Sequence, residues 1–279
     1  MHAPPDPHAE AAALGDWLAA HRRVFVLTGA GCSTASGIGD YRDATGAWKR
    51  RPPITLQAFT GDAATYRRYW ARSFIGWPRF RAAAPNTAHH ALAALERSGR
   101  MSLLVTQNVD GLHQQAGSRA VVDLHGRLDE VVCLGCGDRQ PRAALQQRLD
   151  DDNPGWHATP TAYAPDGDAD IDLEAVARFA PPACLHCGGM LKPDVVFFGE
   201  NVPRARFACA RDALAASDAM LVVGSSLMVY SGFRFARMAR EAGLPLAIAN
   251  RGCTRADDLA TLRVDGECGE MLGRALQER

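Results

Sequence analysis

Two short pairs of cysteines have the spacing of metal ligands. They are Cys133 with Cys136 and Cys184 with Cys187, each pair enclosing two residues. Four thiolates in two such turns suit a tetrahedral Zn²⁺ ion with no open coordination position, which is structural and not catalytic chemistry. A redox dithiol and unpaired core cysteines are the alternatives. The long spacer between the pairs leaves the fold around the ion open. Three further cysteines are expected to be small packing residues: Cys32, Cys209 and Cys253.

A glycine-rich segment follows the apolar run from Val24 to Thr28. In Gly29-Ala30-Gly31-Cys32-Ser33, the two glycines permit a tight turn in which backbone N–H groups approach a pyrophosphate. The dinucleotide fingerprint of dehydrogenases would place a third glycine at position 34, where this chain has Thr34. The segment therefore predicts phosphate binding without predicting a dehydrogenase, and a plain tight turn is the alternative.

Amide, carboxylate and imidazole side chains follow a second apolar run. The segment after Thr106 reads Gln107-Asn108-Val109-Asp110-Gly111-Leu112-His113, and His125 follows shortly in Leu124-His125-Gly126. Amide and carboxylate groups can hydrogen-bond a carboxamide or ribose hydroxyls, and a histidine can act as a base near neutral pH. Spacing alone does not distinguish a catalytic His125 from a structural histidine.

These side chains lie where buried strands should end. Four apolar runs without polar alternation stop abruptly at Gly, Asn, Ser or Asp, which is typical of parallel strands covered on both faces. The runs are 24–28, 103–106, 220–223 and 246–249. Helical patterns occupy residues 87–98, 207–216 and 233–242. The alternation predicts an open α/β sheet, and one crevice outside the carboxyl ends of its strands would gather the motifs.

Two segments interrupt the alternation. Residues 41–86 carry clustered aromatic residues and arginines and predict a helical insertion, while residues 127–194 hold the cysteine pairs and predict a loop-dominated zinc module. Leu191 to Glu200 reads as a strand. We therefore expect residues 1–279 to form one catalytic unit, a Rossmann-like parallel sheet with helices on both faces plus a small domain made of the two insertions. The Rossmann-like part would comprise 9–40, 87–126 and 195–279.

Composition and charge exclude several classes of protein. A chain of 279 residues with 47% hydrophobic residues can bury a large core. Lys+Arg 31 balance Asp+Glu 31, so no net positive field attracts nucleic acid or an anionic membrane. The first residues lack the pattern of a secretory signal, and no apolar run approaches the roughly 20 residues that span a bilayer. We expect a cytoplasmic monomer that binds neither nucleic acid nor membranes.

Taken together, the motifs resemble the sirtuins, which are NAD-dependent protein lysine deacylases. The match runs in order through essentially the whole chain, from the glycine-rich segment to Gly224-Ser225-Ser226 and Asn250. The long spacer between the cysteine pairs and the sequence Tyr69-Trp70-Ala71-Arg72 are most similar to class II, in the branch with the mitochondrial sirtuin-four type and its bacterial relatives. The resemblance implies NAD as co-substrate, one structural zinc ion, and acyl-lysine proteins or peptides as partners.

The resemblance also implies a role for each matching residue. The pyrophosphate of NAD would contact Gly29, Ala30, Gly31 and Ser33, and a mobile cofactor loop would carry Asp40, Tyr41 and Arg42. The nicotinamide and its ribose would be surrounded by Ile38, Gln107, Asn108 and Asp110. The adenosine half would contact Gly224, Ser225, Ser226, Asn250, Arg251 and Cys268. His125 would be the general base, with Asn108 as the second catalytic residue. The substrate backbone would pair, as an added strand, with Val195, Val196, Phe197, Phe198 and Gly199.

The implied reaction transfers the acyl group to ADP-ribose. The acyl-lysine amide oxygen attacks the nicotinamide ribose, nicotinamide leaves, and His125 deprotonates a ribose hydroxyl on the way to O-acyl-ADP-ribose. Mono-ADP-ribosyl transfer to protein is the nearest alternative. A non-catalytic NAD sensor and a zinc-dependent nucleic-acid module are the rivals from other classes, and each is opposed by a feature of the chain, the first by the intact His125 and the second by the neutral charge.

Two positions bear on specificity and on the cofactor loop. Gly39 stands where the family usually has proline, which should loosen the loop. Tyr69 and Arg72 match a Tyr-x-x-Arg pair that holds acidic acyl groups such as succinyl in some class II members, and arginine suits bidentate carboxylate binding. An ordinary turn of a surface helix is the alternative for this pair, and a bulky or branched acyl group is the alternative substrate.

Overall fold

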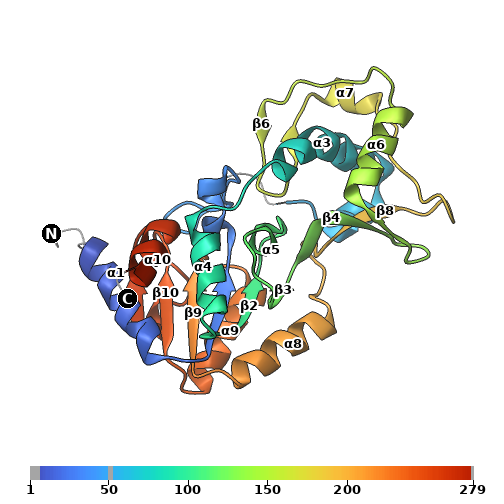
Figure 1. The fold of residues 1–279 in the computed structure, drawn as a ribbon. Coiled ribbons are helices and arrows are strands. Elements are labelled where there is room, and N and C mark those ends of the chain that lie inside the picture. The colour runs from blue at the N-terminus through green and yellow to red at the C-terminus, as the bar shows by residue number, and fades with distance from the viewer. Residues whose placement is uncertain (1–6, 50–52, 278–279) are drawn as a thin grey trace.

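The computed structural model describes residues 7–49 and 53–277, which form a larger and a smaller part (Figure 1). The larger part is built on one six-stranded sheet with the order β11-β10-β9-β1-β2-β3, in which every neighbouring pair is parallel. Its strands are β1 Val24–Thr28, β2 Met101–Thr106, β3 Val121–Asp123, β9 Ala219–Val223, β10 Leu246–Ala249 and β11 Leu262–Val264. All residues of β1, β9 and β10 are buried, as expected for a sheet covered on both faces.

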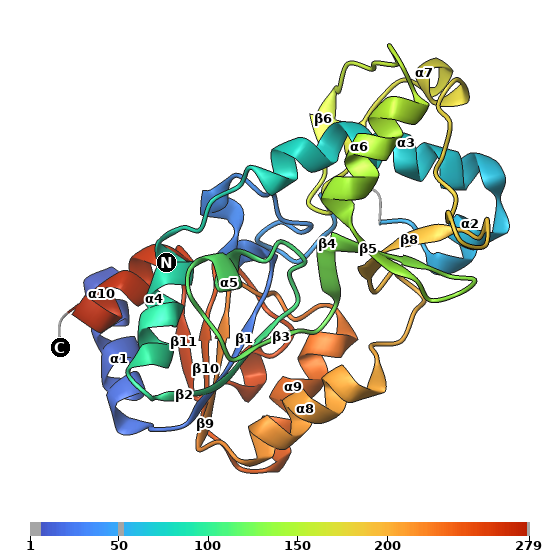
Figure 2. The same cartoon turned by 45° about the vertical axis from the view of Figure 1, so that its right-hand side comes forward.

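Helices cover both faces of this sheet (Figures 1 and 2). One face packs against α1 Pro7–Ala20, α4 Thr87–Arg97 and α10 Cys268–Gln277, and the other against α8 Arg204–Ala215 and α9 Tyr230–Glu241. The short helices of this part are η1 Ala30–Cys32, η2 Thr34–Ser36, α5 Leu112–Gln115 and η3 Asp257–Leu259. The helix α4 begins at Asn86, whose side chain accepts from the Ala88 N–H while His89 caps the Asn86 N–H.

The strand order places a switch point between β1 and β9. From β1 the chain proceeds outward to β2 and β3, and from β9 it proceeds outward in the opposite direction to β10 and β11. In open α/β sheets, ligands bind in the crevice at such a point, outside the carboxyl ends of the strands. The turns after β1 and β9 meet there, because the Gly31 N–H donates to the Gly224 carbonyl at 2.8 Å.

The smaller part contains an antiparallel sheet with the order β5-β4-β8. Its elements are β4 Gly126–Cys133, β5 Arg139–Pro141, β8 Leu191–Val195, the hairpin of β6 Ala162–Tyr163 and β7 Ala169–Asp170, and the helices α2 Leu56–Gly61, α3 Ala63–Arg81, α6 Arg142–Asp152 and α7 Leu173–Ala177. One hydrophobic cluster joins Phe59 and Trp70 of the helical insertion to Val131, Leu145 and Leu191 of the cysteine-bearing segment. The two insertions therefore share a single core.

The predicted fold class is confirmed, and several details of the prediction were wrong. The expected strand 191–200 ends at Val195, since the chain then leaves the small sheet. The segment 127–194 contains two helices and several strands and is not loop-dominated. The strands β3 and β11 were not predicted, because three residues are too short for a hydrophobic pattern. Cys209 and Cys253 are exposed and do not pack in the core. In the part of the chain that the structure describes, no helix combines the length and the apolarity needed to cross a bilayer.

Candidate active site

A cavity of about 1000 Å³ opens at the carboxyl ends of β1, β2, β9 and β10, at the upper end of the size range of small-molecule pockets. All residues predicted to contact the cofactor line it, namely Gly29, Ala30, Gly31, Ser33, Ile38, Asp40, Tyr41, Arg42, Gln107, Asn108, Asp110, Gly224, Ser225, Ser226, Asn250, Arg251 and Cys268. His125 and the segment from Val195 to Gly199 line the same cavity. The fold thus brings together residues from seven separate stretches of the sequence.

The glycines at the floor of the cavity are required by close backbone approach. A Cβ atom added to Gly29 would lie 2.7 Å from the Ser225 Cβ and 2.9 Å from the Gly224 carbonyl oxygen. One added to Gly31 would lie 3.0 Å from the same oxygen, and Gly224 itself has a φ of 58°. The two turns therefore form a backbone-walled cradle, which suits a diphosphate group that approaches main-chain N–H groups.

The hydroxyl of Ser33 connects three polar residues beside this cradle. It donates to the Asp110 carboxylate at 2.7 Å and accepts from the Asn108 side-chain amide at 3.0 Å. The same amide donates to the Gly29 carbonyl at 3.0 Å. Burial raises the pKa of Asp110, while hydrogen bonds from the Leu112 N–H and the Ser33 hydroxyl oppose that shift. The network fixes the Asn108 and Asp110 side chains against the cavity wall, as needed for groups that orient a ribose.

The loop after η2 closes on itself above the cavity. The guanidinium of Arg42 donates to the Gly46 carbonyl at 2.7 Å and stacks 4.0 Å from the centroid of Trp48. Tyr41 meets the same ring edge-on, with centroids 6.3 Å apart. Asp40 and Lys49 form an ion pair across the base of the loop. Arg42 is thus held inside its own loop while it lines the cavity.

His125 lies where β3 leads into β4, with both ring nitrogens engaged. Its Nδ1 is 2.9 Å from the Gln107 carbonyl oxygen, and its Nε2 is 2.8 Å from the Ser231 hydroxyl. Since a carbonyl only accepts, Nδ1 carries the proton, and the Nε2 lone pair accepts from the hydroxyl of Ser231, which also lines the cavity. Burial lowers the pKa of His125 to about 4, and Arg234 and Arg206 act in the same direction. The imidazole is therefore neutral at pH 7 and can accept a proton.

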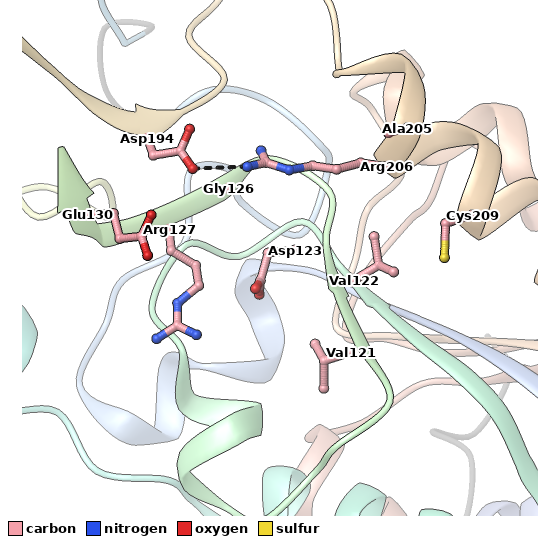
Figure 3. A pocket seen from close by; sticks show the side chains of 10 residues that line it. All are labelled: Val121, Val122, Asp123, Gly126, Arg127, Glu130, Asp194, Ala205, Arg206 and Cys209. Atoms are coloured by element: carbon pink, nitrogen blue, oxygen red, sulfur yellow. Dashed lines mark hydrogen bonds and ion pairs between the residues drawn. The ribbon is translucent and has the colours of Figure 1, made fainter. Parts of the chain in front are cut away.

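The residue after His125 must be glycine for the ring to be held this way. Gly126 has a φ of 82°, and a Cβ there would lie 1.8 Å from the Asp194 carbonyl oxygen. A second, smaller cavity of about 450 Å³ is lined by Gly126, Asp194 and Arg206, among others. The carboxylate of Asp194 and the guanidinium of Arg206 form an ion pair at 3.0 Å, drawn as a dashed line in Figure 3. That ion pair connects β8 to α8 close to the point where Gly126 follows the histidine.

The segment after β8 passes along the cavity. The Val196 N–H donates to the His125 carbonyl at 2.8 Å, and the Phe198 carbonyl accepts from the Leu56 N–H at 2.9 Å. Beyond these bonds the chain turns at Gly199, which has a φ of 85°. The segment predicted to bind substrate therefore lies between the histidine and the helical insertion.

Tyr69 and Arg72 do not line the cavity. Tyr69 is buried in the core of the smaller part, where its ring packs against Phe59 and Phe197 with centroids 5.1 and 5.5 Å away. Arg72 donates to the Ala169 carbonyl at 3.0 Å and to the Asp170 carboxylate at 2.7 Å. Both side chains thus connect α3 to other elements of the smaller part and do not face the cavity.

The predicted metal ligands form one cluster. The Sγ atoms of Cys133 and Cys187 are 3.5 Å apart, those of Cys136 and Cys184 are 3.7 Å apart, and all four lie within 4.8 Å of one another. A tetrahedral zinc ion with bonds of about 2.3 Å places sulfur atoms about 3.8 Å apart. A disulfide would need a separation of about 2 Å. The cluster therefore fits a structural zinc ion with no position left for a substrate.

Residues at the far end of the cavity come from β10 and α10. The side-chain amide of Asn250 donates to the Arg251 carbonyl at 2.9 Å, which shapes the turn after β10. Cys268 is buried at the start of α10, and burial raises the pKa of its thiol to about 12. The thiol is neutral and contributes shape and not charge to this end of the site.

Several lining residues were not predicted from the sequence. They include Trp48, Phe80, Pro165, Met228, Ser231, Arg234 and Glu267. Met228 lies on the loop that carries the predicted Gly224-Ser225-Ser226 motif, and Ser231 lies in the first turn of α9 directly after that loop, so their position after a central strand was a usable signal. Phe80 and Pro165 belong to the smaller part, and no local pattern connects them to the crevice.

Fold and site together define a class of protein. A parallel sheet with a backbone-walled cradle at its switch point suits a nucleotide, and a neutral histidine in the same crevice can accept a proton. A closed four-cysteine cluster in an inserted module adds a structural metal.

Comparison with known proteins assigns the chain to one family within this class. The model described as "Sir2 family" matches residues 29–231, and the chain belongs to that family. It is 62% identical over 260 residues to the "NAD-dependent protein deacetylase" of Xanthomonas campestris pv. campestris, covering 93% of this chain and 89% of the relative. It is 57% identical to the protein of the same name from Bordetella bronchiseptica, covering 95% and 96%.

A mitochondrial relative and two solved structures extend the comparison. The Bos taurus "NAD-dependent protein lipoamidase sirtuin-4, mitochondrial" is 50% identical, over 90% of this chain and 81% of the relative. The structure "Sir2-p53 peptide-NAD+" has a TM-score of 0.75 at 31% identity, covering 94% of this chain and 95% of that one. "Sir2 bound to acetylated peptide" has a TM-score of 0.73 at 30% identity, with the same coverage.

Proposed function

We propose that this chain removes acyl groups from protein lysine side chains, with NAD as co-substrate and His125 as the general base. NAD-dependent protein deacetylation is the activity for which bacterial relatives up to 62% identical are named. One observation carries the assignment of the base. His125 is the histidine that lines the cavity among the described residues, and because its Nδ1 donates a hydrogen bond to the Gln107 carbonyl, its Nε2 has the lone pair that can accept a proton.

Residues at different places in the cavity suit different parts of NAD. The cradle of Gly29, Gly31 and Gly224 suits the diphosphate of NAD, and the network of Asn108 and Asp110 suits its ribose. Bound NAD supplies the ADP-ribosyl group that takes up the acyl group as nicotinamide leaves. An amide oxygen is a weak nucleophile, so rigid alignment of both substrates must supply much of the rate.

His125 accepts a proton from a ribose hydroxyl at Nε2 during this transfer. Nδ1 keeps its proton and continues to donate it in a hydrogen bond to the Gln107 carbonyl, which fixes the ring and stabilises the imidazolium as it forms. Ser231 has to release Nε2 before the ribose hydroxyl can take its place. Neutral His125 at pH 7 is ready for this exchange without prior loss of a proton.

We infer that an extended peptide pairs with the segment from Val195 to Gly199. This inference is supported by the position of β8 at the edge of the small sheet and by the lining of the cavity by that segment. If the enzyme recognises the peptide through its backbone groups, it should accept peptides with different side chains on either side of the acyl-lysine. A peptide N-methylated at a pairing position should raise KM, and an equal KM for methylated and unmethylated peptides would contradict strand addition.

We further propose that the preferred acyl groups are uncharged. Support comes from the ion pair of Arg72 with Asp170, which leaves the guanidinium engaged away from the cavity, and from the burial of Tyr69. The test is a panel of acetyl, succinyl, glutaryl and longer acyl peptides with wild type and Arg72→Met. A structural role predicts an equal loss of kcat/KM for all substrates. A loss confined to acidic substrates would overturn this proposal.

The general base is tested by His125→Ala. Loss of a general base typically costs about 10²–10⁴ in rate, and we expect that loss in deacylated peptide with NAD binding retained. His157→Ala, an exposed histidine elsewhere, is the matched control. Activity of His125→Ala within tenfold of wild type would contradict the assignment. Radiolabelled NAD separates deacylation from ADP-ribosyl transfer, since the label leaves with the acyl group in the first reaction and stays on the protein acceptor in the second.

We also propose that the enzyme works in the cytoplasm. Its eight cysteines are free thiols in the structure, and four of them form the zinc-type cluster, a pattern that favours a reducing compartment.

A further inference from the structure

A second group of metal-ligating side chains lies beneath the cofactor cradle. Ligand atoms of Cys32, His89 and His113 all lie within 4.8 Å of one another, and the three residues are buried. They come from η1, α4 and α5, and Cys32 is not among the residues that line the cavity. Neither the reaction nor the four-cysteine cluster uses them.

His113 is prepared for ligation by its neighbours. Its Nε2 is 2.9 Å from the Thr28 hydroxyl, which itself donates to the Thr106 hydroxyl at 2.8 Å. Nε2 must therefore carry the proton that Thr28 accepts, and Nδ1 keeps a lone pair. This Nδ1 atom is buried and has no hydrogen-bond partner. An imidazole that donates through one nitrogen and leaves the other unpaired has the hydrogen-bonding pattern typical of metal-ligating histidines.

His89 and Cys32 complete the group. The His89 Nδ1 accepts from the Asn86 N–H at 3.2 Å, and its ring centroid lies 4.8 Å from that of His113. Burial lowers the pKa of His89 to about 4 and that of His113 to about 3, so both rings are neutral. Burial, followed by electrostatic interactions with Cys268, Asp110 and Glu267, raises the pKa of Cys32, so the thiol is protonated when no cation is bound. Burial by itself disfavours any charge here, but the nearby carboxyl groups of Asp110 and Glu267 favour a cation over a bare thiolate.

We propose that Cys32 and His113, with His89 as a third ligand, bind a thiophilic d¹⁰ cation such as Zn²⁺ or Cu⁺. One thiolate and two imidazoles are the donor set that such ions prefer. On binding, the metal–sulfur bond forms, the S–H bond breaks, and the proton passes to water. Sulfur and nitrogen ligands of a three-coordinate zinc ion are about 3.8 Å apart, so the pairs must close by at most about 1 Å. Ligation through His89 Nδ1 costs the hydrogen bond from the Asn86 N–H, and ligation through Nε2 costs the 3.4 Å contact with the Ser33 hydroxyl as well.

Occupancy of this site would act on the cofactor cradle. The Cys32 N–H donates to the Gly29 carbonyl at 2.9 Å, and the Cys32 carbonyl accepts from the Asn86 side chain at 2.9 Å. Drawing Cys32 toward α4 and α5 therefore displaces the turn that faces the diphosphate of NAD. The bound cation therefore inhibits the enzyme by raising KM for NAD. This inhibition rests on the proposed function, whereas the binding of the cation does not.

The decisive measurement is the zinc content of the full chain after dialysis against a buffered excess of ZnCl₂. We expect two ions in wild type, one in Cys32→Ala and in Cys32→Ser, and two in Cys209→Ala, which removes an exposed thiol elsewhere. X-ray absorption of the wild type should show nitrogen ligands that the Cys32 variants lack. The far-UV circular dichroism spectrum and Tm without added zinc should stay near those of wild type in these variants and so report that they fold.

Wild type with a single zinc ion would overturn the proposal, and so would a Cys32 variant that keeps two ions. The kinetic arm separates binding from regulation. Added zinc should raise KM for NAD in wild type and in Cys209→Ala but not in Cys32→Ala. If the second ion is counted and KM for NAD does not move, the site stands and the inhibitory effect is refuted.

Discussion

The low pKa of His125 predicts a deacylation rate that is insensitive to acid in the range where an ordinary histidine titrates. The perturbation is a change of pH from 7.5 to 5.5. A base with the usual pKa of about 6.5 would be about nine-tenths protonated at pH 5.5, and kcat/KM would fall about tenfold. With the pKa of His125 at about 4, less than about a twentieth is protonated at pH 5.5, and the rate should hold.

The direction of this effect follows from burial. Removing the ring from water disfavours the imidazolium and is the largest influence on the pKa; the hydrogen bond to the Gln107 carbonyl comes next and opposes it, and Arg234 and Arg206 disfavour the imidazolium further. The neutral form that can accept a proton therefore persists to lower pH than in an exposed histidine. The profile of kcat/KM is the right observable because it reports the free enzyme, the state that the structure describes.

The assay is steady-state deacetylation of an acetyl-lysine peptide between pH 5 and 8, at constant ionic strength and with circular dichroism at each pH. We expect a flat profile down to about pH 5.5 while the fold is retained. A single acid limb centred near pH 6.5, with an intact circular dichroism spectrum, would refute the reasoning, since it would mean that the base is solvated like an exposed histidine.

Three further predictions follow from the same geometry. Ser231→Ala removes only the hydroxyl that caps His125 Nε2, and because a neutral hydrogen bond is worth about 1 kcal/mol, kcat should change by less than about tenfold; a larger fall would mean that the hydroxyl itself transfers the proton. Gly29→Ala forces a Cβ to 2.7 Å from that of Ser225, so KM for NAD should rise at least about tenfold in a folded protein, and an unchanged KM would contradict the cradle. Removal of zinc by a chelator, or the substitution Cys184→Ser, should lower Tm by more than about 10 °C, as expected for a loss of several kcal/mol of stability. Added zinc should restore the Tm of the chelated enzyme, and an unchanged Tm after chelation would exclude a structural metal.

The sheet and most of the site could be predicted because their signals are local. The strands 24–28 and 246–249 have the predicted bounds, since fully buried parallel strands are continuous apolar runs. Parallel strands present their carboxyl ends at one edge, so residues that follow them, such as Ser33, Asn108 and Ser225, had to share a crevice. The cysteine pairs were recognisable because zinc requires four sulfur ligands in two short turns.

Other features depend on contacts between segments far apart in the chain. The helix α6 was missed because its buried residues, Arg142, Leu145 and Leu149, have no clear apolar stripe, and the leucines are buried in a cluster that both insertions form together. The placement of Arg72 was equally hidden, since its partner Asp170 lies on a hairpin that no local pattern connects to α3. Such pairings are set by tertiary packing, which overrides local propensity.

The sequence by itself determined which chemical groups are present and at which ends of the strands they lie. It therefore determined the class of fold, the cofactor-binding crevice and the four-cysteine cluster. Only the tertiary structure decided how those groups are tuned. The proton position on His125 depends on the Gln107 carbonyl, and its low pKa depends on burial in the folded state. The grouping of Cys32, His89 and His113 likewise exists only where three separate elements pack together, because ligand geometry is a property of distances in space and not of spacing along the chain.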